Sequence, residues 1–183
     1  MEKTAINPLI EKRWSPREFT ATKLTKAQIE ALFEAARRAA SWRNSQPWRF
    51  IYATPDDTAT WNKLFACLAE MNQQWVKTAS LLILTVVQKE DPKHNVRLGY
   101  SWHDLGLSVG NMTFQAMDMG LHLHNMAGFS KEKAIELFDI PDSFEPVTMI
   151  AAGKIDSGTL PPAERVRRPL DKLLFNGDWN EMV

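Results

Sequence analysis

Two arginines flank a Trp-Ser-Pro turn near the start of the chain, in the stretch EKRWSPREF at residues 11–19. Pro16 blocks a continuous helix here and biases the residue before it toward extended backbone, in which alternate side chains share a face. Arg13, Ser15 and Arg17 can then point together around one phosphate, because guanidinium groups match phosphate oxygens and stay charged. The same residues also fit a helix start capped by Ser15 with both arginines solvated, so this segment alone leaves both interpretations open.

A second basic cluster lies at the far end of the chain, in AERVRRPLDKLL. Its arginines, Arg165, Arg167 and Arg168, precede a proline that blocks any helix running through them. A solvated run of charges is the usual interpretation of such a stretch. The ends of a domain often lie close together, however, so the two clusters can meet in space.

Helical patterns alternate with strand patterns along the chain, without a linker, repeat or low-complexity tract. A capping box of Thr25 and Gln28 begins a helix that we expect to reach about Ala40. We expect other helices from Thr54-Pro55, over KEKAIELF and over YSWHDLGLSVGNMTFQAMDMG. The last stretch is apolar nearly all round, which predicts a central buried helix, and Gly120 is its expected stop.

Four stretches have sequence patterns that predict β-strands. SLLILTVVQ predicts a strand buried on both faces, and WRFIYA predicts a half-buried strand in which Trp48, Phe50 and Tyr52 alternate with their neighbours. LHLHNM and PVTMIAAGKI complete an α+β pattern. The strand order cannot be derived from these patterns.

Composition narrows the class of partner. Lys plus Arg equals Asp plus Glu at 22 each, so no global basic field attracts nucleic acid or anionic lipid, and an anion site must be local. The length of 183 residues predicts one domain with one core. The single cysteine, Cys67, lies in a mostly apolar stretch and is expected to pack rather than react. Without an apolar leader or membrane span in the sequence, we expect a soluble, cytoplasmic protein.

Five motifs in order along nearly the whole chain resemble the successive signatures of the FMN-dependent nitroreductase family: RWSPREF, ASWRNSQPWRF, NQQWVKTASLLILTV, MAGF and RVRRPLDKLL. The resemblance implies an α+β fold, a three-layer-like sandwich with a central, mostly antiparallel sheet packed by helices. It implies a single FMN-binding domain over residues 1–183, and an intertwined homodimer with FMN at the subunit interface.

The resemblance also assigns the cofactor contacts at the two chain ends. The residues that it places at the FMN phosphate are Arg13, Ser15, Arg165 and Arg167. It places Arg17 beside the pyrimidine edge of the isoalloxazine ring. This assignment gives the two basic clusters a common ligand.

The remaining cofactor contacts come from the middle of the chain. The resemblance implies that Ser41 and Asn44 reach the flavin of the other subunit and that Asn72 bonds the pyrimidine side of the ring. It also implies that the backbone N–H of Gly128, with Ala127 beside it, faces the N5 region, where small residues permit close approach of the backbone.

The implied activity is ping-pong electron transfer from NAD(P)H through FMN to nitroaromatic, quinone or similar conjugated acceptors. The flavin carries this chemistry, so no side chain is assigned as catalytic, and the expected partners are small molecules rather than nucleic acid or membrane. Two alternatives stay open. One is other flavin chemistry of the same superfamily, such as reductive dehalogenation or dehydrogenation, and the other is a non-enzymatic module that binds phosphorylated ligands or RNA.

Two tryptophans depart from the family pattern. Trp42 stands where many members have serine, and it can narrow the pocket, stack on an aromatic acceptor or pack at an interface. Trp75 stands where some relatives place a lysine near the flavin, which removes one positive charge. His122 and His124 share one face of a predicted strand as two metal ligands would, but no third ligand lies at an obvious spacing, so packing or surface roles are expected.

Overall fold

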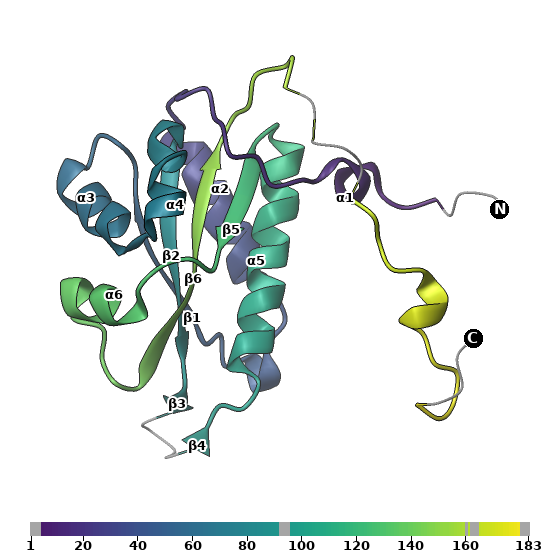
Figure 1. Ribbon diagram of the computed structural model, residues 1–183. Helices are drawn as coiled ribbons and strands as arrows, with labels where there is room; N and C mark the ends of the chain where they lie inside the picture. Colours follow the sequence, from purple (N-terminus) through teal and green to yellow (C-terminus); the bar gives the residue numbers. More distant parts are fainter. Residues whose placement is uncertain (1–4, 92–95, 160, 162–164, 180–183) are drawn as a thin grey trace.

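A four-stranded antiparallel sheet lies at the centre of the computed structural model, which describes residues 5–91, 96–159, 161 and 165–179 (Figure 1). The strand order is β1-β2-β6-β5, and every pairing within this sheet is antiparallel. The strands are β1 (Trp48–Ala53), β2 (Leu81–Gln88), β5 (His122–Met126) and β6 (Phe144–Gly153). A separate hairpin pairs β3 (Glu90–Asp91) with β4 (Val96–Arg97).

Helices cover both faces of this sheet. The longer helices α2 (Lys26–Arg37) and α5 (Ser101–Asp118) pack on one face, and α3 (Thr58–Cys67) and α6 (Lys131–Phe138) pack on the other (Figure 1). The short elements are α1 (Pro8–Lys12), η1 (Trp42–Asn44), α4 (Glu70–Gln73), η2 (Val76–Thr78) and η3 (Leu170–Lys172). This layered arrangement of a helix-packed antiparallel sheet confirms the predicted fold class.

Strand β2 is the centre of the core because its side chains alternate between the two helical layers. Leu82 and Leu84 belong to the apolar cluster under α3 and α6, whereas Leu81 and Ile83 belong to the cluster under α2 and α5. All four side chains are fully buried. The continuous apolar run therefore predicted the strand correctly, including its burial on both faces.

Several helix boundaries differ from the sequence prediction. The predicted capping box forms at Thr25 and Gln28, but α2 ends at Arg37 rather than near Ala40. Helix α3 begins at Thr58, because the Asp57 side chain caps it by accepting from the Thr60 N–H at 3.1 Å, so the prediction of a start at Thr54-Pro55 was wrong.

Helix α5 is amphipathic rather than buried all round. Leu105, Met112 and Ala116 are buried against the sheet, but Leu107 and Phe114 are about two-fifths exposed, at 41% and 40%. The predicted stop at Gly120 is confirmed, since this residue adopts a left-handed φ of 68°. The apolar side chains on the outer face of α5 are therefore available to a partner.

The helical prediction around Cys67 is confirmed, because this residue ends α3 inside the core. Burial raises the pKa of its thiol, and the sulfur donates to the carbonyl oxygen of Lys63 at 3.2 Å. A neutral, buried thiol of this kind packs rather than reacts. Across the described residues, no helix combines the length and the apolar character needed to cross a membrane.

The two ends of the chain leave the sheet on the same side. The N-terminal segment with α1 passes beside α5, and the C-terminal arm, residues 165–179, runs near α1 and then extends away from the sheet (Figure 1). Side chains of this C-terminal arm are exposed although many are apolar: Val166, Leu170, Leu173, Leu174 and Trp179.

Candidate functional site

The arginines of the two chain ends come together in space. Arg13 has extended backbone, and its Nη1 donates to the Ser15 hydroxyl at 3.3 Å. Burial first, and then the positive charges of Arg167 and Arg165, lower the pKa of the Arg13 guanidinium. Because such repulsion acts over a short range, the guanidinium groups are neighbours, and their common environment favours an anion.

Two histidines of β5 lie beneath this arginine cluster, which we define as Arg13, Arg17, Arg165 and Arg167. The ring of His122 lies 5.9 Å from the ring of Trp14, in an edge arrangement. The Nδ1 of His124 is 2.8 Å from the Pro16 carbonyl oxygen, to which it donates. The predicted shared face is therefore confirmed, and both side chains contact the N-terminal segment.

The surroundings of both imidazoles favour the neutral form. Burial is the largest cause that lowers the pKa of His122, and the charge of Arg13 adds to it. Burial also lowers the pKa of His124; the hydrogen bond to Pro16 opposes this, and the charges of Arg17 and Arg165 lower it further. The sequence prediction assigned these histidines only packing or surface roles, although their alternate spacing was the signal that could have linked them to a site.

Asn72 and Gly128 meet at one edge of this region. The Asn72 side-chain amide donates to the Gly128 carbonyl oxygen at 2.9 Å, and the backbone N–H of Ala69 donates to the same oxygen at 2.9 Å. A Cβ on Gly128 would lie 2.9 Å from the Asn72 Nδ2, so only glycine fits without a shift. Ala127 and Gly128 are both exposed, which leaves this backbone open to close approach by a ligand.

Trp75 connects Asn72 with the histidines. Its ring centroid is 4.6 Å from that of His124, and its backbone N–H donates to the Asn72 carbonyl oxygen at 3.4 Å. The indole Nε1 is buried and has no hydrogen-bond partner among the described residues. Trp75 therefore supplies an aromatic wall at this position, where some members of the family that the sequence resembles have a lysine.

Ser41 and Asn44 lie elsewhere in the single chain. The Ser41 hydroxyl accepts from the Gln46 N–H at 3.0 Å, and the Trp42 N–H donates to Asp104 in the first turn of α5 at 2.9 Å. Strand β5 follows the other end of this 18-residue helix, which is about 27 Å long at the usual rise per residue. One copy of the chain therefore does not bring Ser41 and Asn44 to the arginine cluster.

Trp42 lies at the same remote position. Its ring is 37% exposed, faces Tyr100 at 6.4 Å and is covered by the Arg43 guanidinium at 4.8 Å. These contacts fit the predicted interface or stacking roles, and within one chain they leave the arginine cluster unaffected.

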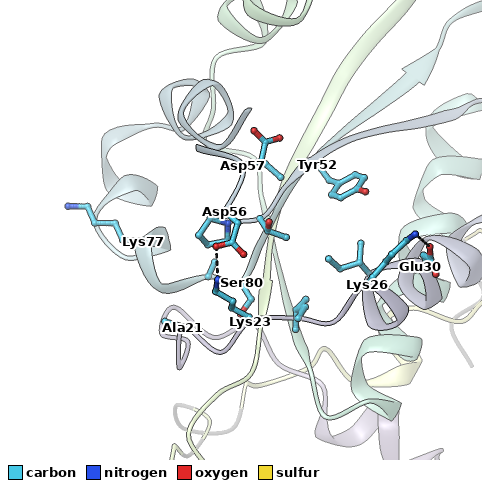
Figure 2. Close-up of a pocket in the computed structure, with 15 residues that line it drawn as sticks. Ala21, Lys23, Lys26, Glu30, Tyr52, Asp56, Asp57, Lys77 and Ser80 are labelled. Carbon is cyan, nitrogen blue, oxygen red and sulfur yellow. Dashed lines mark hydrogen bonds and ion pairs between the residues drawn. The ribbon is translucent and has the colours of Figure 1, made fainter. Parts of the chain in front are cut away.

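An open pocket of about 720 Å³ lies on another part of the surface, between the start of α2 and the end of β1 (Figure 2). Its charged side chains pair with one another: Lys23 is 2.7 Å from Asp56, and Lys26 is 3.6 Å from Glu30. Lys77 points away from these pairs (Figure 2). Because its charges are locally balanced and no member of the arginine cluster lines it, this pocket is a weaker candidate for an anion site.

The arginine cluster with Ser15, Asn72 and Gly128 can hold a molecule that has a phosphate at one end and a flat polar group at the other. The arginines match phosphate oxygens, and the bare Gly128 backbone admits a planar ring. Within the described residues, His, Cys, Asp and Glu side chains form no group of three suited to a metal ion. The donor set is thus that of an organic anion site.

Comparison with known proteins places this arrangement in a family. Residues 10–154 match the nitroreductase family model. A relative from Mycolicibacterium smegmatis, an uncharacterized 15.4 kDa protein in the ask 5′ region, is 31% identical over 132 residues, which cover 68% of this chain and 86% of the relative.

Solved structures agree over nearly the full length. An oxidoreductase containing FMN superposes with a TM-score of 0.88 at 31% identity, covering 99% of this chain and 96% of that chain. A nitroreductase family protein from Clostridium difficile 630 has a TM-score of 0.75 at 25% identity, covering 95% of this chain and 97% of that chain. The family suggested by the sequence motifs is confirmed, and the chain belongs to the nitroreductase family.

Proposed function

We propose that this protein is an FMN-dependent oxidoreductase that transfers electrons from NAD(P)H to nitroaromatic, quinone or similar conjugated acceptors. The observation that carries the proposal is the meeting of Arg13 with Arg165 and Arg167 from the opposite end of the chain. Neighbouring guanidinium groups repel one another, and a phosphate dianion relieves this repulsion. Family membership and the likeness to an FMN-containing oxidoreductase support FMN as the bearer of that phosphate.

The residues at the site fit FMN along its whole length, from the phosphate to the isoalloxazine ring. In this proposal the phosphate is bound by Arg13, Ser15, Arg165 and Arg167. Arg17 and Asn72 hold the pyrimidine side of the ring, and the backbone at Ala127 and Gly128 faces N5. The close contact between Asn72 and Gly128 supports the last assignment, because it keeps the ring-binding amide beside the exposed glycine.

Bound FMN supplies the hydride and electron transfer, so the protein needs no acid, base or nucleophile of its own for that chemistry. The chain contributes binding and orientation. The positive charge of Arg17 also favours negative charge on the pyrimidine edge of the ring, which makes the cofactor easier to reduce. We assign no catalytic residue, as the sequence prediction also did.

The proposal includes a homodimer with the cofactor at the interface and one FMN-binding domain per chain. The C-terminal arm supports this, because Val166 is 95% exposed and Trp179 is 80% exposed, and soluble proteins rarely leave such a row of apolar side chains uncovered. A second copy also gives a role to Ser41 and Asn44, which then bind the partner's flavin. Sedimentation or light scattering measures the expected dimer.

An absorption spectrum of the purified protein tests the function. We expect a yellow protein that releases FMN on denaturation, loses its flavin absorbance under anaerobic NADH or NADPH, and regains it when a quinone or nitroaromatic compound is added. A folded protein that stays colourless after incubation with excess FMN would contradict the proposal. If the arginine cluster binds RNA instead, the affinity for RNA would fall steeply with salt concentration.

A further inference from the structure

His122 and His124 are ionisable groups that the proposed function does not use. They lie one strand period apart on β5, and each contacts the segment that carries Arg13 and Arg17. Both rings are partly covered by aromatic side chains, since Trp14 packs near His122 and Trp75 packs on His124. The two imidazoles therefore lie directly below the arginine cluster, and we call His122 and His124 together the histidine floor.

The charges that face these imidazoles are positive. Arg13 and Arg17 come from the N-terminal segment and Arg165 comes from the C-terminal arm. On β6, the strand that pairs with β5, the opposing residues are Gly153 and Ala151, and the ring of Trp75 packs on His124. No carboxylate contributes to the electrostatic surroundings of either histidine in the described part of the chain.

The hydrogen bonds leave room for a second proton on each ring. The Nδ1 of His124 donates to Pro16, so its Nε2 is the nitrogen that gains a proton. The Nδ1 of His122 is buried and has no partner among the described residues, and burial, followed by the charge of Arg13, lowers the pKa of this ring. A doubly charged anion above the two imidazoles offsets part of the positive charge that they face, and this favours their protonated form.

We propose that His122 and His124 are part of the phosphate site, and that binding of a phosphate dianion between the two chain ends is coupled to proton uptake by these imidazoles. The proposal rests on the proposed function for the identity of the ligand, FMN. Neutral histidines limit repulsion within the empty arginine cluster, and protonated histidines add positive charge when the dianion arrives. The site thereby adjusts its own charge to that of its ligand.

This coupling predicts a direction for the change of FMN affinity with pH that the ionisation of the phosphate alone does not produce. If the imidazoles gain protons on binding, affinity for FMN increases as the pH falls toward and below about 6.5, the ordinary pKa of histidine. The second pKa of a phosphate monoester is about 6, so a site made only of arginines would lose affinity slightly over the same range. The two cases therefore differ in direction.

The test is a titration of the apoprotein with FMN and with riboflavin, which has the same ring without the phosphate. Calorimetry at several pH values, in buffers of different ionisation enthalpy, gives both the Kd and the number of protons taken up. We expect proton uptake, and a Kd that decreases as the pH falls, for FMN but not for riboflavin. The variants His122→Gln and His124→Gln each reduce the uptake, and the double variant abolishes it.

His103→Gln is the matched control, because this histidine lies on α5 with its side chain 68% exposed. It should leave both the uptake and the pH effect unchanged. Should the double variant fail to fold, NMR titration of the imidazoles in the unaltered protein, with and without FMN, measures the same shift directly.

The outcomes separate the two proposals. FMN binding whose affinity is constant or falls as the pH falls, with no proton uptake, overturns the role of the histidines and leaves the oxidoreductase proposal standing. Absence of FMN binding at every pH overturns both.

Discussion

The Asp104 carboxylate accepts the backbone N–H of Trp42 at 2.9 Å and thereby ties helix α5 to the turn at residues 41–46. Asp104 is almost fully buried, at 3% exposed. The turn needs such support because three of its non-glycine residues have positive φ: Arg43, Asn44 and Gln46. Conformations of this kind cost about 1–3 kcal/mol each and persist only where the surroundings hold them.

Replacing Asp104 should therefore destabilise the protein. We expect Asp104→Ala to lower the free energy of unfolding by about 2 kcal/mol, because it leaves the Trp42 N–H without its acceptor, and Asp104→Asn to lower it less. Urea unfolding followed by circular dichroism measures the change. Asp118→Ala, at the exposed end of the same helix, is the control and should alter stability by no more than about 0.5 kcal/mol. Equal losses in the two alanine variants would contradict the role of Asp104.

Gly128→Ala should weaken cofactor binding through Asn72. The added Cβ would lie 2.9 Å from the Asn72 Nδ2, so the amide must move from its present hydrogen bond, at a cost of about 1–3 kcal/mol. We expect a higher Kd for FMN in fluorescence titration. Gly106→Ala is a suitable control, because a Cβ at that helical position meets nothing within 4 Å. Unchanged affinity in Gly128→Ala would argue against this placement of the ring.

Arg13→Gln should change ligand affinity and apoprotein stability in opposite directions. Loss of one charge-assisted hydrogen bond, about 1.5–3 kcal/mol, raises the Kd for FMN by about 10- to 100-fold and leaves riboflavin binding nearly unchanged. The apoprotein should become no less stable, because repulsion from Arg167 and Arg165 is removed. Titration and thermal unfolding measure both effects. Arg38→Gln, which alters a surface pair with Glu34, should change neither, and a similar effect in that variant would refute the assignment.

Arg17→Ala should lower the reduction potential of the bound flavin while the fold is kept. A charge about 4 Å from the pyrimidine edge favours the reduced, negatively charged ring by at most about 4 kcal/mol at an effective dielectric constant near 20. For a two-electron couple this corresponds to a decrease of up to about 90 mV. Spectroscopic redox titration of the FMN-loaded variant measures it. An unchanged potential would show that Arg17 lies away from the ring.

The stability of the apoprotein should fall as the pH is lowered below about 6.5, the ordinary pKa of histidine. Burial and the nearby arginines lower the pKa of His122 and His124 in the folded protein. Between the folded and the ordinary pKa the unfolded chain binds more protons, so the free energy of unfolding decreases with decreasing pH in this window. Urea midpoints at a series of pH values measure the slope. The double variant of both histidines to Gln should have a flatter profile, and an equal slope would count against the shift.

Much of the local structure could be predicted from short stretches of sequence. The capping box at Thr25, the doubly buried run of β2 and the stop at Gly120 each depend on residues only a few positions apart, and all three are present. Two predictions were wrong, the start of α3 at Thr54-Pro55 and the full burial of α5, because both features depend on contacts beyond the local sequence. A competing cap at Asp57 and the exposure of one helical face depend on how each helix packs, which spacing alone does not specify.

The sequence by itself determined the family, through its ordered motifs, and the chemistry of the candidate ligand, because arginine beside a hydroxyl suits a phosphate wherever it occurs. Only the tertiary structure decided which groups meet. His124 bonds Pro16 across 108 positions and Asn72 bonds Gly128 across 56, contacts that follow from placing β5 at the edge of the sheet. Local spacing carries no record of strand order, so the histidine floor under the arginines could be recognised only after the chain was folded.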